Sequence, residues 1–189
     1  MNTNRLEKLE AVRGFAALYV VFFHMLPQKF FLFGINIGFL FRFGPEMVIV
    51  FFLLSGFVIK YTYEKSKDKT FRYYFIRRFI RLYIPLLIIF LMGYLIQCYK
   101  AGGLANPELL NLLGNVFMLQ DVYSLKPNVI VPSYLGNGVL WSLSYEWWFY
   151  MLFYVLVTNI KSEKLNRFVF GLTILAAATY LIYPFIVNR

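Results

Sequence analysis

Five long apolar runs constrain the fold of this chain more than any other feature. They cover residues 11–26, 45–63, 82–99, 141–160 and 168–187. Each run approaches the ~20 residues that an α-helix needs to cross the hydrocarbon core, and the first, which is short, can extend backwards through Leu6. The chain is 60% hydrophobic and 21% aromatic, which is more apolar surface than a soluble domain of 189 residues can bury. The sequence therefore predicts one all-α membrane domain over residues 1–189, a polytopic transmembrane helix bundle with about five spans.

The basic residues predict how this bundle is oriented. A net charge of +10 invites a nucleic-acid interpretation, but most of the 19 Lys and Arg residues lie before residue 14, within 60–81 or within 161–167. If the amino terminus is cytoplasmic, all three segments face the cytoplasm, as the positive-inside rule requires. We therefore expect a multi-pass membrane protein that contacts membrane lipid and no nucleic acid.

The residue inventory predicts no metal and no disulfide. Cys98 is alone, His24 is the one histidine, and the carboxylates do not cluster along the sequence. A zinc or iron site needs several such ligands at characteristic spacing.

The first apolar run carries three ionisable side chains. Glu10, Arg13 and His24 project at roughly 0°, 300° and 320° around a helix, so an unbroken helix would carry them along one face. His24 would lie about 16 Å beyond Arg13 along the helix axis. Ionisable groups within a span are costly and raise a functional hypothesis. His24 is either a general base for an acceptor hydroxyl or a side chain that only bonds a neighbouring helix.

The segment W-S-L-S-Y-E-W-W-F-Y opens the fourth apolar run. Its tryptophans fit an interfacial aromatic belt, and Trp141 needs no other explanation. Glu146 is different, because it lies about a turn and a half into the run and needs a partner, which the first run could supply. Ser142 and Tyr150 lie four residues to either side of Glu146, on its face of the helix.

A pair of small residues, Ser55 and Gly56, interrupts the second apolar run. Such a pair either lets two helices pack closely or lets a ligand approach the backbone. A further apolar stretch, residues 109–119, predicts a surface-lying or re-entrant helix in the long external segment.

Three arginines, Arg77, Arg78 and Arg81, precede the third apolar run. Juxtamembrane arginines can set topology and attract anionic lipid. Alternatively they bind phosphate, since Arg78 and Arg81 share a helix face. Residues 70–81 interleave aromatic and basic side chains, which predicts an interfacial helix that continues into the third span.

These four segments, in this order, resemble the motifs of the acyltransferase-3 family of bacterial integral membrane proteins. L-E-A-V-R-G-F-A-A, followed by His24, is similar to the opening (D/E)-x-x-R-G-x-A-A, and V-F-F-L-L-S-G-F is similar to F-F-x-L-S-G-F. R-R-F-I-R-L-Y-I-P is similar to R-x-x-R-(I/L)-x-P, with the proline one place later. W-S-L-S-Y-E-W-W-F-Y is similar to W-S-L-x-x-E-x-x-F-Y, with Trp147 where many members carry a polar residue. The resemblance covers residues 5–155.

The resemblance implies an enzyme of the bacterial inner membrane. Such enzymes transfer an acyl group, often acetyl, from acyl-CoA to a hydroxyl of a surface saccharide such as lipopolysaccharide, with no metal. By this resemblance His24 is the catalytic base, Arg13 holds the donor or intermediate, and Glu146 belongs to the catalytic core. The implied CoA-binding residues are Arg77, Arg78 and Arg81, and the implied supporting residues are Glu10, Ser55, Gly56, Ser142 and Tyr150.

Members of this family are about twice as long, with around ten spans, so the chain resembles their amino-terminal half. Two alternatives follow. The chain is an inactive truncated fragment, or it is a transporter or flippase whose polar pathway contains Arg13, His24 and Glu146.

Overall fold

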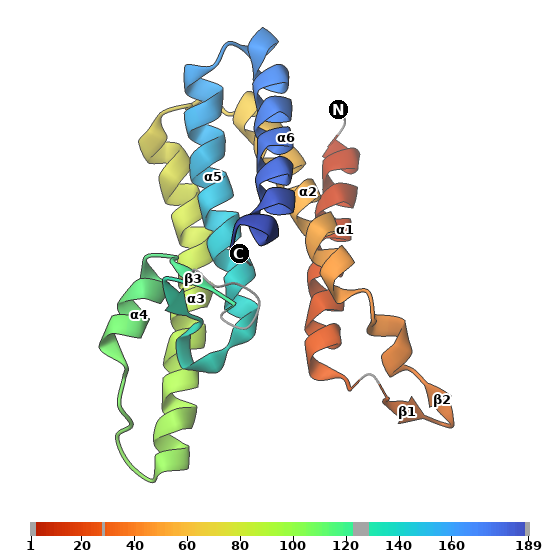
Figure 1. Cartoon of the computed structure of the whole chain (residues 1–189), viewed down its shortest axis with the longest axis vertical. Coiled ribbons are helices and arrows are strands. Elements are labelled where there is room, and N and C mark those ends of the chain that lie inside the picture. The colour runs from red at the N-terminus through yellow and green to blue at the C-terminus, as the bar shows by residue number, and fades with distance from the viewer. Residues whose placement is uncertain (1–2, 28, 123–128, 188–189) are drawn as a thin grey trace. The chain divides into compact units, whose positions relative to one another are not determined.

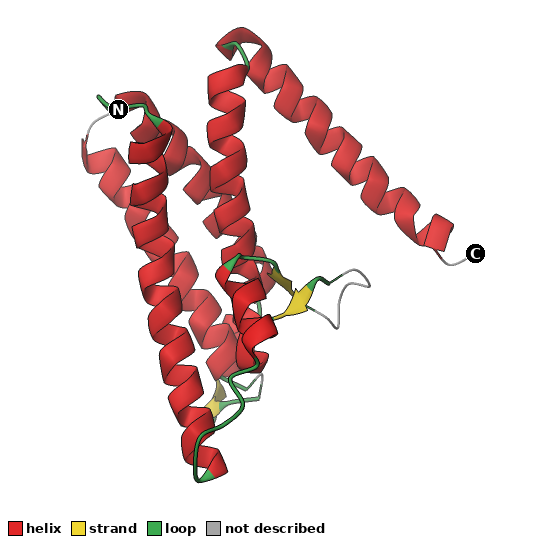
Figure 2. Cartoon of the chain, turned by 90° about the vertical axis from the view of Figure 1, so that its left-hand side faces the viewer, coloured by secondary structure: helices red, strands yellow, loops and turns green. Residues whose placement is uncertain are grey.

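The structure is a computed structural model that describes residues 3–27, 29–122 and 129–187, and α-helices dominate it (Figures 1 and 2). The α-helices are α1 (Thr3–Met25), α2 (Gly44–Lys65), α3 (Phe71–Ala101), α4 (Leu109–Val116), α5 (Trp141–Asn159) and α6 (Ser162–Val187). Short strands form two pairs, β1 (Phe31–Leu32) with β2 (Ile35–Asn36) and β3 (Gln120–Asp121) with β4 (Val131–Pro132). The 3-10 helices are η1 (Gly38–Phe41), η2 (Tyr134–Gly136) and η3 (Gly138–Leu140). The all-α prediction is confirmed.

The chain groups into two compact units, Met1–Phe149 and Tyr150–Arg189, with the boundary inside α5. The second unit consists of the end of α5 and α6. That residues 1–189 act as a single domain stays a prediction.

Each apolar run corresponds to one helix to within a residue at its end, but three helices begin well before their runs. α1 begins at Thr3, α3 at Phe71 and α6 at Ser162. The polar residues before each run are mostly good helix formers such as Glu, Lys and Arg, so the helix continues past the apolar boundary. The predicted interfacial helix over 70–81 and the third span form the single helix α3, 31 residues long.

Local signals fix both ends of α3. At its start the Thr70 hydroxyl accepts a hydrogen bond from the Tyr73 backbone N–H at 3.5 Å. At its end Gly102 adopts φ 66°, and the Gly103 N–H donates to the Cys98 carbonyl at 3.2 Å, as in a glycine-capped helix terminus. Pro85 lies inside the helix without ending it. α3 is therefore one element that runs from the basic segment into the apolar run.

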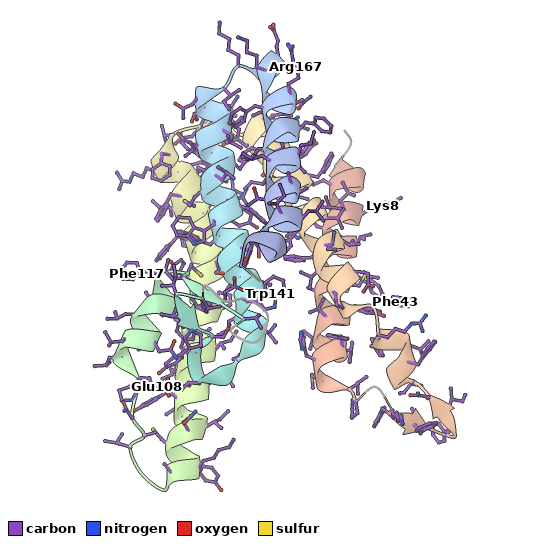
Figure 3. All side chains as sticks on the ribbon, viewed as in Figure 1. Lys8, Phe43, Glu108, Phe117, Trp141 and Arg167 are labelled. Atoms are coloured by element: carbon purple, nitrogen blue, oxygen red, sulfur yellow. The ribbon has the colours of Figure 1, made fainter. Side chains whose placement is uncertain are left out.

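Side chains on most of the α3 surface are apolar (Figure 3). Leu82, Leu86 and Phe90 are buried at four-residue intervals and form one stripe, whereas apolar side chains such as Ile88 and Leu91 are more than half exposed. A helix that is apolar all round needs protein or lipid on its other faces. Among the described residues, α2 and α3 are long and apolar enough to cross a membrane. Two of the five predicted spans are thus candidates in the structure, and the other three stay predictions.

Helices α1 and α2 pack side by side (Figure 1). η1 covers the end of α1, where the Phe41 ring lies 5.3 Å from that of Tyr19 and 5.1 Å from that of Phe22. At Gly44 the contact is so close that a Cβ would lie 2.3 Å from the Phe23 ring. Glycine at this position therefore allows α2 to begin against α1.

We expect Gly44→Ala to lower the free energy of unfolding by about 1–3 kcal/mol, because the added methyl group displaces a packed aromatic ring. Gly56→Ala is the matched control within α2, since a Cβ there meets nothing within 4 Å. Alanine in a helix interior is favoured over glycine, so this variant should be as stable as the wild type or more stable. Thermal unfolding in detergent micelles measures both effects. Equal stability of the two variants would contradict the close contact at Gly44.

A polar network holds α4 and the following loop in place. The Asn115 side chain is fully buried, and its Nδ2 donates to the Pro132 carbonyl at 2.9 Å while its Oδ1 accepts from the Tyr134 N–H at 2.9 Å. Two bonds of 2.8 Å then join this region to longer helices. The Tyr83 hydroxyl of α3 donates to the Val116 carbonyl at the end of α4, and Trp148 Nε1 of α5 donates to the Met118 carbonyl in the loop. The predicted helix within 109–119 is thus present as α4, and it is tied to two longer helices.

Candidate active site

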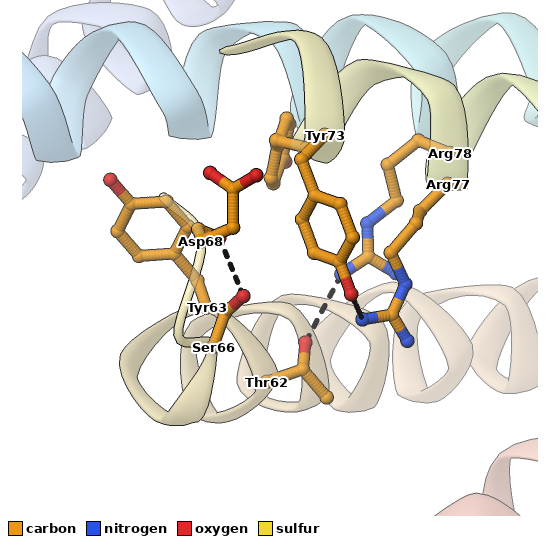
Figure 4. A pocket seen from close by; sticks show the side chains of 8 residues that line it. Thr62, Tyr63, Ser66, Asp68, Tyr73, Arg77 and Arg78 are labelled. Atoms are coloured by element: carbon orange, nitrogen blue, oxygen red, sulfur yellow. Dashed lines mark hydrogen bonds between the residues drawn. The ribbon is translucent and has the colours of Figure 1, made fainter. Parts of the chain in front are cut away.

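A pocket lies at the turn between α2 and α3 (Figure 4). It is open to solvent, and its empty volume of about 290 Å³ includes part of that solvent-facing space. Its lining residues are Thr62, Tyr63, Ser66, Asp68, Tyr73, Tyr74, Arg77 and Arg78. Three tyrosines and two arginines give it aromatic walls and cationic donors, a combination that suits a phosphate on an aromatic or sugar scaffold.

Neighbouring hydroxyl groups orient the two arginines. Arg77 Nη1 donates to the Tyr73 hydroxyl at 3.1 Å, and Arg78 Nη2 donates to Thr62 Oγ1 at 3.1 Å (Figure 4). The Arg77 guanidinium also lies 5.4 Å from the Tyr73 ring centre. Such contacts reduce the conformational freedom of both side chains before any ligand arrives.

One carboxylate lies in the same pocket. The Thr70 backbone N–H donates to Asp68 Oδ1 at 2.8 Å, and this bond, followed by one with the Thr70 hydroxyl, lowers the pKa of the Asp68 carboxyl. Asp68 is therefore ionised at neutral pH, and its charge offsets one of the two guanidinium charges. The lining remains positive overall.

Arg81 does not line this pocket. It lies one turn further along α3 and is half-buried. Of the three arginines that the sequence singled out, the structure therefore brings together Arg77 and Arg78. The tyrosines beside them were missed, although the alternation of aromatic and basic residues over 70–81 was a signal for them.

Three candidate polar residues are buried on three different helices. Arg13 of α1 is 9% exposed, Ser55 of α2 is 4% exposed, and Glu146 of α5 is 5% exposed. Buried charges and hydroxyl groups are costly unless something compensates them. Among the described residues, the buried Ser55 Oγ has no hydrogen-bond partner. This hydroxyl group can therefore still donate or accept a hydrogen bond.

The packing of α1 against α2 places Arg13 and Ser55 at a similar level. The two helices are joined by a short connection and meet where Phe23 contacts Gly44. The two helices run in opposite directions, and Arg13 lies ten residues before Phe23. Arg13 is therefore level with Leu54, which lies ten residues after Gly44 and immediately before Ser55.

A ring contact joins α2 to α5 in the same region. Phe52 lies one turn before Ser55, and Phe149 lies one turn after Glu146; their ring centres are 5.6 Å apart. Residues three apart lie near one another on a helix surface, so Ser55 and Glu146 lie next to this contact between α2 and α5. We name Arg13, Ser55 and Glu146 the buried polar layer.

His24 lies outside this layer. It is exposed in the last turn of α1, where its ring is 5.0 Å from that of Phe23, and Glu10 is exposed as well. Because α1 is unbroken, His24 and Arg13 are about 16 Å apart along the axis. That is further than an arginine side chain reaches, so the two residues cannot contact the same reacting carbonyl. Glu10, Arg13 and His24 all lie on the unbroken helix α1. Of these three residues Arg13 is buried, whereas Glu10 and His24 are exposed.

The remaining sequence candidates have local surroundings. Gly56 is exposed, so the close approach considered for the small pair is not seen there. Ser142 Oγ donates to the Val139 carbonyl at 3.0 Å, which supports the start of α5. Tyr150 is 3% exposed and belongs to the second unit.

Trp147, the departure from the family pattern, has a packing role. It is 7% exposed, and its ring lies 5.4 Å from that of Phe75 and 5.1 Å from that of Tyr83. It therefore holds α5 against α3, next to Glu146. Within the described ranges, no group of three or more His, Cys, Asp or Glu side chains gathers as a metal site would require.

The comparisons with known proteins identify the family. The sequence profile of the family described as an acyltransferase domain matches residues 6–189. Acyltransferase MdmB of Streptomyces mycarofaciens is 32% identical over 192 residues, which cover 98% of this chain and 47% of that relative. The chain therefore belongs to the acyltransferase-3 family, as its motifs predict, and it spans about half the length of this curated relative. No solved structure matches it.

Proposed function

We propose that this chain forms the donor-binding and catalytic part of a multi-pass acyltransferase of the bacterial inner membrane. It transfers an acyl group, normally acetyl, from acyl-CoA to a hydroxyl of a surface saccharide. Family membership over residues 6–189 supports acyl transfer. The observation that carries the choice of donor is the pocket of Arg77 and Arg78, because its two guanidinium groups match the phosphates of CoA.

The topology of α2 and α3 supports a cytoplasmic donor. The pocket lies at the turn that joins two candidate spans, and this turn belongs to the most basic segment of the chain. By the positive-inside rule that segment faces the cytoplasm, where CoA is present. His24 lies in the last turn of α1, at the end that η1 covers. If the amino terminus is cytoplasmic, this end of α1 is on the external side, where the acceptor would bind.

The proposed reaction needs a base, a donor clamp and no further cofactor. The His24 imidazole accepts the proton of the acceptor hydroxyl, and the hydroxyl oxygen forms a bond to the thioester carbonyl carbon. The carbon–sulfur bond then breaks, the CoA thiolate leaves, and the proton held by the His24 imidazolium is released, so that the thiol and the neutral imidazole are restored. Because Arg13 is too far from His24 to contact the same carbonyl, Arg13 binds the donor along its length, and the buried Ser55 and Glu146 belong to the same part of the proposed site.

Binding of the phosphorylated end of CoA tests the donor assignment directly. Isothermal titration of the micelle-solubilised chain with adenosine 3′,5′-bisphosphate gives its dissociation constant. We expect the double variant Arg77→Ala/Arg78→Ala to bind at least about 10-fold more weakly, since two charge-assisted bonds are lost. Arg72→Ala is the matched control, because Arg72 is exposed on α3 and does not line the pocket. An unchanged affinity in the double variant would remove the assignment of this pocket to the donor.

Asp68→Asn should change the same affinity in the opposite direction. The asparagine oxygen can still accept from the Thr70 N–H, so the turn is kept while one negative charge leaves the pocket. We expect adenosine 3′,5′-bisphosphate to bind about two- to five-fold more tightly, which is the size of an exposed charge interaction. The gain should shrink at high salt. Weaker binding would show that the pocket does not receive the anion.

A further inference from the structure

The connection between α1 and α2 is an unusually apolar surface loop. Within it, Phe33 is 95% exposed, Ile35 67% and Phe31 62%, and Leu40 of η1 is 61% exposed. The hairpin of β1 and β2 extends beyond the end of α1 (Figure 1). A large exposed apolar patch of this kind marks an interaction surface. We call residues 29–43 the apolar hairpin.

The tip of the hairpin has a residue that local turn chemistry does not favour. Leu32 pairs with Ile35, so Phe33 and Gly34 form a two-residue turn, with φ of 50° and 79°. Turns with two positive φ values favour Asn-Gly or Asp-Gly, and a bulky residue at positive φ is strained by about 1–2 kcal/mol. Local turn chemistry therefore does not account for an aromatic ring at the tip.

Cations lie at both borders of the apolar residues. Lys29 precedes them and is exposed, and Arg42 follows them. The Arg42 guanidinium lies 4.1 Å from the Phe39 ring centre and 4.6 Å from that of Phe43, which is labelled in Figure 3. An apolar tip with cations behind it has the charge order of a bilayer leaflet, where acyl chains lie beneath phosphate groups. The hairpin also runs directly into Gly44, the first residue of the candidate span α2.

From these observations we propose that the apolar hairpin inserts into the membrane. Phe31, Phe33 and Ile35 lie among the lipid acyl chains, while Lys29 and Arg42 contact lipid phosphates. This inference rests on the membrane location in the proposed function. It makes the hairpin an anchor that fixes the height of the α1 end, and thus of His24, relative to the bilayer surface.

Spin labels on single cysteines test the insertion. The chain has one native cysteine, and Cys98→Ser keeps an acceptor for the Ala105 N–H that lies 3.4 Å from Sγ. In this background we would label Phe33→Cys, Ile88→Cys on the exposed face of α3, and Lys67→Cys in the α2–α3 turn. The protein is reconstituted in vesicles of phosphatidylethanolamine and phosphatidylglycerol. Collision with oxygen reports lipid, and collision with a water-soluble nickel chelate reports water.

We expect the label at residue 33 to behave like the label at residue 88, with collisions with oxygen several-fold more frequent than collisions with the nickel chelate. At residue 67 we expect collisions with the nickel chelate to be the more frequent. If residue 33 is nickel-accessible while 88 is oxygen-accessible, the hairpin lies in water and the proposal fails although the membrane location stands. Low accessibility to both reagents at 33 means that protein covers the tip, which also overturns the proposal. Nickel accessibility at 88 refutes the membrane location itself.

A second variant keeps the hairpin folded while removing the anchor. Phe33→Asn gives the turn its favoured Asn-Gly sequence, so the strands should remain paired. When Phe33 is present, a label at Ile35→Cys should be accessible to oxygen. When Phe33→Asn is added to the same protein, that label should become accessible to the nickel chelate. An unchanged label at 35 would show that the Phe33 ring does not hold the hairpin in lipid.

Discussion

Glu146→Gln is expected to lower the rate of acyl transfer at least about 100-fold. Glutamine preserves the size of the side chain and removes its charge, in a place where the carboxylate is 5% exposed and low polarity strengthens each electrostatic interaction. The measurement is the rate of labelled acetyl transfer from acetyl-CoA in membranes that contain equal amounts of each variant. The affinity for adenosine 3′,5′-bisphosphate should change little, because the pocket at the α2–α3 turn does not include Glu146.

Trp141→Phe is the control within the same motif. Trp141 is half-buried and contacts the Tyr145 ring at 5.5 Å, a contact that phenylalanine largely keeps. We expect this variant to retain most of the transfer rate. Equal, mild effects of the two substitutions would reduce Glu146 to a packing role and remove it from the buried polar layer as a functional residue.

Asn115→Leu should destabilise the first unit by about 2–4 kcal/mol. Leucine has a similar size but leaves the Pro132 carbonyl and the Tyr134 N–H without their buried partner, and each such group costs about 1–3 kcal/mol. Thermal unfolding in micelles gives the total effect, and hydrogen exchange of residues 131–136 shows whether the loss begins at β4 and η2.

Asn137→Ala provides the comparison for Asn115. Asn137 is exposed and accepts one long bond of 3.4 Å from the Val139 N–H, so its loss should cost at most about 0.5 kcal/mol. If both substitutions had the same small effect, the Asn115 network would not hold α4 to the loop.

The fold was predictable where apolar length alone decides it. The runs at 45–63 and 141–160 correspond closely to α2 and α5, because an apolar stretch of this length has few other solutions. The apolar hairpin and the β3–β4 pair were not predicted, since two-residue strands leave no periodic signal. The bonds of Asn115 and Gln120 were also missed: isolated polar residues in an apolar segment signal a buried network, but the sequence does not say which backbone groups they bind.

The candidate site was predictable as a set of residues and less so as a geometry. Arg13 and Glu146 are unusual enough in apolar runs to be recognised, and both are buried. The sequence placed Arg13 and His24 on one face, but shared direction does not overcome 16 Å of axial separation. Two of the three arginines share a pocket because of the position of the α2–α3 turn. Just before this turn, Thr62 accepts a hydrogen bond from Arg78. Helical periodicity along the sequence carries no information about that contact.

Acyl transfer itself is the most direct test of the proposed function. Membranes that carry the wild-type chain or its His24→Ala variant are supplied with labelled acetyl-CoA, and label in cell-envelope saccharide is measured. Phe23→Leu is the control for the neighbouring ring contact, which is lost in both variants. We expect transfer by the wild type and by Phe23→Leu, and its loss in His24→Ala. Equal transfer by wild type and His24→Ala, or CoA consumption without labelled saccharide, would contradict the proposed function.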